Sequence, residues 1–210
     1  MPIFKRKRYE LNLLHPYDFG GFPEHTYHVR YPAPGSPGLA IRVQALLEAA
    51  GFPTQLNSDR GFDHGTYTPL VPMYPNADVP IVQLSIKRRF DPETHLLVGR
   101  ALAPLRSEGV LIVASGLSFH NLGTFGPEAL APSKTFDSWL QETLAAAPSE
   151  RWGRLIEWGK APSARQAHPR EDHLVPLMVA VGAAESEPAA MIYHEDDFMG
   201  AWCVSSFRLG

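Results

Sequence analysis

The chain has 210 residues, of which 44% are hydrophobic and 20% are charged, and its formal net charge at pH 7 is −3. This length and balance suit one globular domain with an ample core, and they exclude a disordered or collagen-like chain. The small negative charge offers no electrostatic surface to nucleic acid or to an anionic membrane, so we expect neither as a partner.

The single cysteine and the lack of a long apolar run in the sequence lead us to expect a cytoplasmic protein. Cys203 is the only cysteine, which rules out an internal disulfide, and its neighbours predict a buried strand in which the thiol is an inert core group. The sequence shows neither an apolar run long enough to span a membrane nor the apolar stretch of a signal peptide.

The first half of the chain is predicted to contain three strands and one helix. Strands are expected at residues 9–14, 53–56 and 79–86, and the helix at 39–50 is stopped by Gly51. The segment 16–38 between the first strand and this helix is rich in proline and glycine and is expected to be a long loop.

The second half alternates helices and strands. Helices are predicted at 92–106, with Asp91 as N-cap, at 135–147, continued or followed by 151–158, and at 173–184. The apolar run at 110–114 predicts a strand covered on both faces, and strands at 189–194 and 201–207 close the chain. Together the elements predict an α/β fold with a mixed central sheet and helices on both faces, in a single domain over residues 1–210.

Three short segments place histidine among turn-forming or acidic residues. They contain His64, His120, and the pair His168 and His173. Imidazole binds divalent metals and transfers protons near neutral pH, so these segments would form a metal-dependent active site if the fold brought them together.

Each histidine also has a plainer interpretation. His120 follows the predicted strand at 110–114, where α/β proteins place ligands, and general base and structural roles are equal alternatives. His173 begins an apolar helix and could bind a metal, although Glu171 and Asp172 before it are also typical helix-dipole complements. For His64 a role in a turn is the simpler interpretation, and a hydrogen bond to a ligand is the alternative.

The remaining histidines have no partners at diagnostic spacing, and surface or core roles are expected for them; they are His15, His25, His28, His95 and His194. His194, which precedes three acidic residues, is the reserve candidate. Motifs for a nucleophile elbow, a phosphate-binding loop, a dinucleotide site and a paired-histidine zinc helix are all absent from the sequence.

Several longer motifs follow one another in the order found in a known family. They are YDFGGFP at 17–23 with YPAPGSP at 31–37, FDHGTYTPL at 62–70, SGLSFHNL at 115–122, HPREDHLVPL at 168–177, and the ending SSFRLG at 205–210. In these motifs the chain resembles the class III extradiol ring-cleavage dioxygenases, specifically their DOPA-dioxygenase-like branch. The resemblance covers essentially all of the sequence from Tyr17 onward.

The resemblance implies a function and roles for the histidines. Family members have an α/β fold and a non-haem Fe(II) centre, with zinc as the alternative metal, where a catechol meets O2 and its ring opens beside the diol. By analogy His173 is a metal ligand, His120 the acid/base that handles the catechol protons, and His64 a hydrogen-bond donor beside the site.

The start of the sequence departs from the family pattern. The resemblance implies two more metal-binding histidines, one in a His-Gly-Ser-Pro-type segment and one in a Ser-Ala-His-Trp segment, and residues 1–14 contain neither. The chain is therefore expected to be shortened at this end relative to the family. A replacement strand at 9–14, with His15 as a replacement metal ligand, is one expectation. An exposed sheet edge would favour a homo-oligomer.

Three functional hypotheses remain at this point. The first is an iron-dependent extradiol dioxygenase that cleaves a catechol with O2. The second is a non-catalytic dioxygenase-like domain that binds an aromatic ligand or a partner subunit. The third is a zinc-dependent hydrolase on a similar scaffold, which would act without O2.

Overall fold

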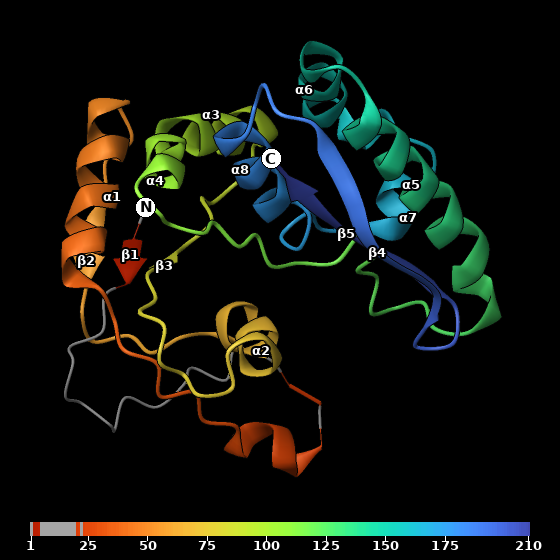
Figure 1. Ribbon diagram of the computed structural model, residues 1–210. Helices are drawn as coiled ribbons and strands as arrows, with labels where there is room; N and C mark the ends of the chain where they lie inside the picture. Colours follow the sequence, from red (N-terminus) through yellow and green to blue (C-terminus); the bar gives the residue numbers. More distant parts are fainter. Residues whose placement is uncertain (1, 5–19, 22) are drawn as a thin grey trace. The chain divides into compact units, whose positions relative to one another are not determined.

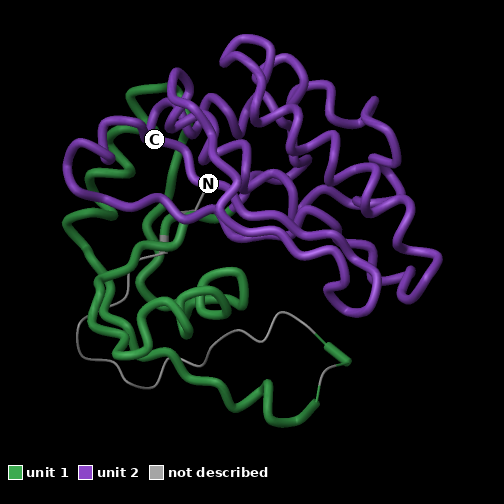
Figure 2. Tube along the Cα trace, turned by 45° about the vertical axis from the view of Figure 1, so that its right-hand side comes forward, with its two compact units in different colours: residues 1–85 green, residues 86–210 purple. Residues whose placement is uncertain are grey.

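A computed structural model describes residues 2–4, 20–21 and 23–210. The chain divides into two compact units, residues 1–85 and residues 86–210, which Figure 2 shows in green and purple. Helices and strands are interspersed in the first unit, and in the second unit a series of helices precedes two strands; this mixture confirms the α/β class. The assignment of residues 1–210 to a single domain stays a prediction. None of the helices within the described ranges combines the length and apolar composition that a membrane crossing requires.

The first unit contains a three-stranded sheet in the order β2–β1–β3 (Figure 1). β1 (Pro2–Phe4) runs parallel to β2 (Gln55–Asn57) and antiparallel to β3 (Gln83–Leu84), so the sheet is mixed, as predicted. The strand predicted at 79–86 is much shorter than expected. The strand predicted at 9–14, and His15 with it, lie outside the described residues.

The predicted helix at 39–50 is confirmed as α1 (Pro37–Ala49), which packs against β1 and β2. Its start is encoded locally: the Oγ of Ser36 accepts a hydrogen bond from the backbone N–H of Leu39 at 3.4 Å, and Pro37 occupies the first turn. Its end is encoded by Gly51, whose φ of +81° suits a residue without a side chain.

Two elements of the first unit were not predicted. A 3-10 turn, η1 (Glu24–His28), lies in the expected loop, and α2 (His64–Met73) begins at His64. α2 contains two prolines, Pro69 and Pro72, and because proline is unfavourable inside a helix the sequence did not indicate one here. The helix persists because Tyr67 and Leu70 on it are buried in the core of this unit.

The second unit begins with a helix that ends earlier than predicted. α3 (Pro92–Leu102) has Asp91 as its N-cap, as predicted, with Oδ2 accepting from the N–H of Thr94 at 2.8 Å. Pro104 has no N–H to continue the ladder, so the chain restarts as the short α4 (Pro104–Ser107). α3 packs closely on α8 (Val175–Ala183), and the two backbones meet at Gly99 and Gly182, where a Cβ on either residue would overlap the other helix.

The rest of the second unit is a hairpin packed by helices. The two closing strands are confirmed as β4 (Ala189–Phe198) and β5 (Trp202–Leu209), which form an antiparallel sheet of their own. α5 (Pro127–Ala145) packs on both strands, and Phe136 and Leu140 on it share a core with Trp202. α6 (Pro148–Ile156), η2 (Trp158–Lys160) and α7 (Ala164–Ala167) follow α5.

The buried strand predicted at 110–114 is not formed. Within the described part of the chain, this segment belongs to no sheet, and Leu111 and Val113 are 66% and 44% exposed. An apolar run becomes a buried strand only when another strand pairs with it, and a run of five residues cannot specify that partner. The segment instead leads directly into the turn that carries His120.

Candidate active site

Two segments of the second unit lie side by side and bring two of the predicted histidines together. The backbone N–H of Leu117 donates to the carbonyl of His173 at 3.2 Å, and that of His120 donates to the carbonyl of Ala167 at 2.9 Å. Gly116 permits this approach, because a Cβ there would overlap the carbonyl oxygen of His173. The sequence SGLSFH therefore positions His120 through its glycine and its small residues.

The imidazole rings of His120 and His173 are stacked, with centroids 3.5 Å apart and planes inclined by 13°. Asp172 lies beside them, and one ligand atom from each of these three residues lies within 4.8 Å of the others. All three side chains are half-buried. We call this group, His120, Asp172 and His173, the stacked-histidine site.

Asp172 lies between His173 and the positively charged side chain of Arg170. Its Oδ1 lies 3.4 Å from Nδ1 of His173, and its Oδ2 lies 3.5 Å from Nε of Arg170. The guanidinium of Arg170 in turn lies over the ring of Phe90, 4.7 Å from its centroid. Phe90 lines an open cleft of about 580 Å³ that reaches Glu171, the residue before Asp172. The carboxylate of the site thus has defined charged neighbours, and the residues of the site do not line the cleft themselves.

The chemistry of the donor set fits a divalent metal. Two imidazoles and one carboxylate are the ligand types of non-haem Fe(II) sites, and zinc accepts the same atoms. A metal binds imidazole through a lone pair that lies in the ring plane. Because the two rings are nearly parallel, one ion cannot lie in both planes in this arrangement. The geometry therefore favours one imidazole as ligand and leaves the other for proton transfer.

His168, from the same motif as His173, is fully buried and stands apart from these roles. Its Nε2 lies 3.0 Å from the carbonyl oxygen of Ser118, and since a carbonyl can only accept, Nε2 carries the hydrogen. Burial lowers the pKa of His168 to about 4, so the ring is neutral at neutral pH.

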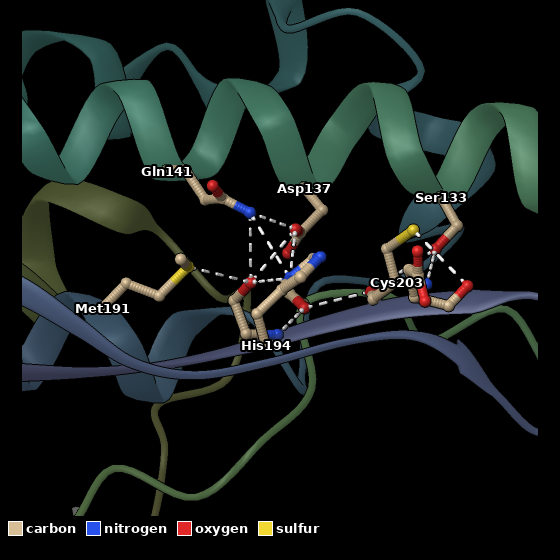
Figure 3. A network of polar contacts seen from close by, with 9 residues as sticks. Ser133, Asp137, Gln141, Met191, His194 and Cys203 are labelled. Atoms are coloured by element: carbon tan, nitrogen blue, oxygen red, sulfur yellow. Dashed lines mark hydrogen bonds and ion pairs between the residues drawn. The ribbon is translucent and has the colours of Figure 1, made fainter.

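A second group of polar residues lies between α5 and the hairpin, and we call it the hairpin cluster: Asp137, Gln141, His194 and Ser205. Figure 3 shows Asp137 and Gln141 pointing from α5 toward His194 on β4. Nδ1 of His194 lies 3.4 Å from Oδ2 of Asp137 and 3.0 Å from Oγ of Ser205. In a hydrolytic triad the two ring nitrogens contact acid and serine separately. Here one nitrogen faces both, so the cluster is not a triad.

The remaining histidines and the cysteine singled out in the sequence lie outside the stacked-histidine site or outside the described residues. His64 is the first residue of α2 in the first unit, where the carboxylate of Asp63 is bonded to the amide of Gln83. His15 lies outside the described residues. His95 is buried in α3, between the carbonyl of Asp91 and the N–H of Lys87, and burial lowers its pKa. Cys203 is buried on β5, as predicted, and burial raises the pKa of its thiol.

Sequence reasoning missed two residues near the site. Asp172 was interpreted only as a complement to a helix dipole, yet α8 begins three residues later, at Val175, and the carboxylate faces His173. The adjacency of Asp172 and His173 was the available signal. His168 shares the motif of His173, and no feature of its sequence context indicates burial against aromatic rings.

Known proteins resemble this chain along most of its length. A family model described as the catalytic LigB subunit of aromatic ring-opening dioxygenase matches residues 12–203. The 4,5-DOPA dioxygenase extradiol of Beta vulgaris is 42% identical over 197 residues, which is 91% of this chain and 72% of that protein. The protein of the same name from Escherichia coli K12 is 37% identical over 199 residues, which is 92% of this chain and 73% of that protein.

A solved structure shares the fold. The crystal structure of the uncharacterized protein JW3007 from Escherichia coli K12 aligns with a TM-score of 0.81 at 31% sequence identity. The alignment covers all of this chain and 80% of that chain.

Proposed function

The chain belongs to the class III extradiol ring-cleavage dioxygenases, enzymes that open aromatic rings, and on this premise we propose that it cleaves a catechol with O2 at an Fe(II) centre. The observation that carries the proposal is the convergence of His120, Asp172 and His173 in one half-buried group. When bound, the iron would supply a centre at which the catechol oxygens and O2 are held together.

We assign the metal-ligand role to His173. The carboxylate of Asp172 places a negative charge 3.4 Å from Nδ1 of His173, and the role we assign to the ring uses the lone pair of Nε2 for the ion. A carboxylate beside a ligating imidazole favours the positive charge of the bound metal. Asp172 itself can add an oxygen ligand. His15, outside the described residues, stays a proposed further ligand, and zinc is the alternative metal.

We assign proton transfer to His120. A catechol must lose hydroxyl protons when its oxygens bind a metal, and a neutral imidazole nitrogen of His120 can accept one of them. The stacked geometry supports this division, because the ring of His120 lies over that of His173 without sharing its plane. The half-buried position limits water around the ring and keeps the proton close to the reacting groups.

His64 is proposed as a hydrogen-bond donor to the substrate, and this role rests on the family resemblance alone. It lies at the first position of α2, in a segment held by the bonds between Asp63, Thr66 and Gln83. These bonds fix the start of the helix and with it the backbone of His64. A His64→Gln variant with lowered turnover and unchanged iron content would support the role.

The test is oxygen-dependent ring opening by the iron-loaded chain. The protein is reconstituted anaerobically with Fe(II) and desalted, and then mixed with catechol or DOPA, while O2 uptake and the absorbance of the opened product are followed. We expect one O2 consumed for each ring opened and no reaction under nitrogen. Catechol binding without turnover would instead support the non-catalytic aromatic-binding domain. Turnover without O2 would support a hydrolase.

A further inference from the structure

His168 is a polar side chain placed in an apolar pocket. It is 0% exposed, and the rings of Phe136 and Trp158 meet it edge-on, at centroid distances of 5.2 and 6.1 Å. Its Nδ1 finds no hydrogen-bond partner among the residues that the structure describes. A buried polar atom without a partner is unfavourable, and a leucine would fill a similar volume without it. What the imidazole adds is one directed N–H group.

That N–H group holds the turn that carries His120. Nε2 of His168 donates to the carbonyl oxygen of Ser118 at 3.0 Å, and Ser118 precedes His120 by two residues. Because a carbonyl oxygen can only accept, the hydrogen lies on Nε2 and the direction of the bond is fixed, while burial keeps the ring neutral at neutral pH.

Other bonds secure the same turn from its remaining sides. The Oγ of Ser118 accepts from the N–H of Ser205 at 3.0 Å and donates to the carbonyl of Cys203 at 3.3 Å, which ties the turn to β5. The N–H of His120 donates to the carbonyl of Ala167, next to His168. The bond from His168 is thus a side-chain hydrogen bond between the motif that carries His173 and the turn that carries His120.

We propose that His168 is a positioning residue that acts through Ser118 to keep the imidazole of His120 stacked on that of His173. The proposal rests on the proposed function only insofar as His120 is the acid/base. Misplacement of a reacting group by about 1 Å can lower a rate by as much as 100-fold, so a turn held on several sides favours proton transfer.

The structural test uses the metal-free protein and needs no activity. Stacked aromatic rings shift each other's proton resonances upfield, so the ring protons of His120 and His173 should show this shift in histidine side-chain NMR spectra. His120→Gln and His173→Gln variants assign the signals. We expect His168→Leu to lose the shift and His168→Gln, whose amide nitrogen can occupy the position of Nε2, to keep it.

A second pair of variants covers the case in which His168→Leu does not fold. Asparagine is one methylene shorter than glutamine and cannot reach the carbonyl of Ser118, so His168→Asn should lose the shift while His168→Gln keeps it. Retention of the shift in His168→Asn or His168→Leu, or its absence in the wild type, would overturn the proposal.

The kinetic test separates positioning from stability. With iron and catechol, His168→Leu should lower kcat about tenfold or more with little change in KM, and His168→Gln should restore most of it. Equal kcat in the leucine and glutamine variants would overturn the role in positioning. If the wild type itself opens no ring, the proposed function fails, and the NMR result still decides whether His168 holds His120.

Discussion

The stacked-histidine site and the hairpin cluster place an imidazole and a carboxylate at the same distance in very different surroundings. Nδ1 of His173 lies 3.4 Å from Asp172, and Nδ1 of His194 lies 3.4 Å from Asp137. Asp137 is 2% exposed, and its Oδ2 also accepts from Gln141 at 2.6 Å and from Ser205 at 3.0 Å. Asp172 is 24% exposed and has an exposed arginine as its other charged neighbour.

This difference shows that a short distance between histidine and carboxylate does not identify a metal site. A cation at Asp137 would have to displace two hydrogen bonds, one from Gln141 within α5 and one from Ser205 on β5, and would leave these half-buried donors without their acceptor. At Asp172 an ion would face half-buried donors that converge from two segments. The hairpin cluster therefore fastens a helix to a hairpin, and the stacked-histidine site is the one suited to a ligand.

The largest expected effect is on metal binding. His173→Ala should lower iron retention by more than about 100-fold, because even residues that only orient a ligand contribute 10–100-fold to affinity. His194→Ala, the matched change in the hairpin cluster, should retain iron like the wild type. Elemental analysis after anaerobic reconstitution and desalting measures both. Equal losses in the two variants would remove the distinction between the regions.

A pH dependence of stability should arise beside the stacked-histidine site. The pKa of His168 is about 4 in the folded chain, below the ordinary value of 6.5, so between these values the unfolded chain binds more protons. The free energy of unfolding should fall as the pH drops from about 6.5 to about 4, by roughly 3 kcal/mol from this group.

His168→Gln provides the control for this dependence. It removes the titrating ring and keeps the contribution of His95, whose pKa is lowered in the same direction. Urea unfolding at a series of pH values should therefore give a shallower slope for the glutamine variant. An unchanged slope would mean that His168 does not stay neutral in the folded chain.

A smaller effect is expected at the hairpin cluster, and it concerns stability. Asp137→Ala leaves the amide of Gln141 and the hydroxyl of Ser205 without their buried acceptor, which should cost about 1–3 kcal/mol of unfolding free energy. Asp172→Ala, at a more exposed carboxylate, should cost less than about 1 kcal/mol. Urea midpoints at constant slope compare the two. A larger loss of unfolding free energy in Asp172→Ala than in Asp137→Ala would contradict the structural role that we give to the hairpin cluster.

Local signals in the sequence predicted much of the fold. The N-cap Asp91, the stop at Gly51 and the two closing strands are encoded by the residues themselves or their near neighbours. The strand at 110–114 was mispredicted because strand formation depends on a distant partner. α2 was missed because buried contacts outweigh its two prolines.

The site was partly predictable because some of its residues lie in recognisable local motifs. His120 and His173 stood out through their motifs, and the structure brings their rings to 3.5 Å. Asp172 acquires its significance from the turn before α8, and His168 from the aromatic rings of Phe136 on α5 and Trp158 on η2. Such contacts follow from tertiary packing, which a short motif does not specify.

The most direct test of the central claim, that His173 holds the metal while His120 transfers protons, is a comparison of iron content and turnover in His120→Gln. We predict the iron content of the wild type together with a kcat at least about 100-fold lower, the usual scale for a positioned acid/base. Loss of iron in step with activity would contradict the account, because it would make His120 a ligand of the metal.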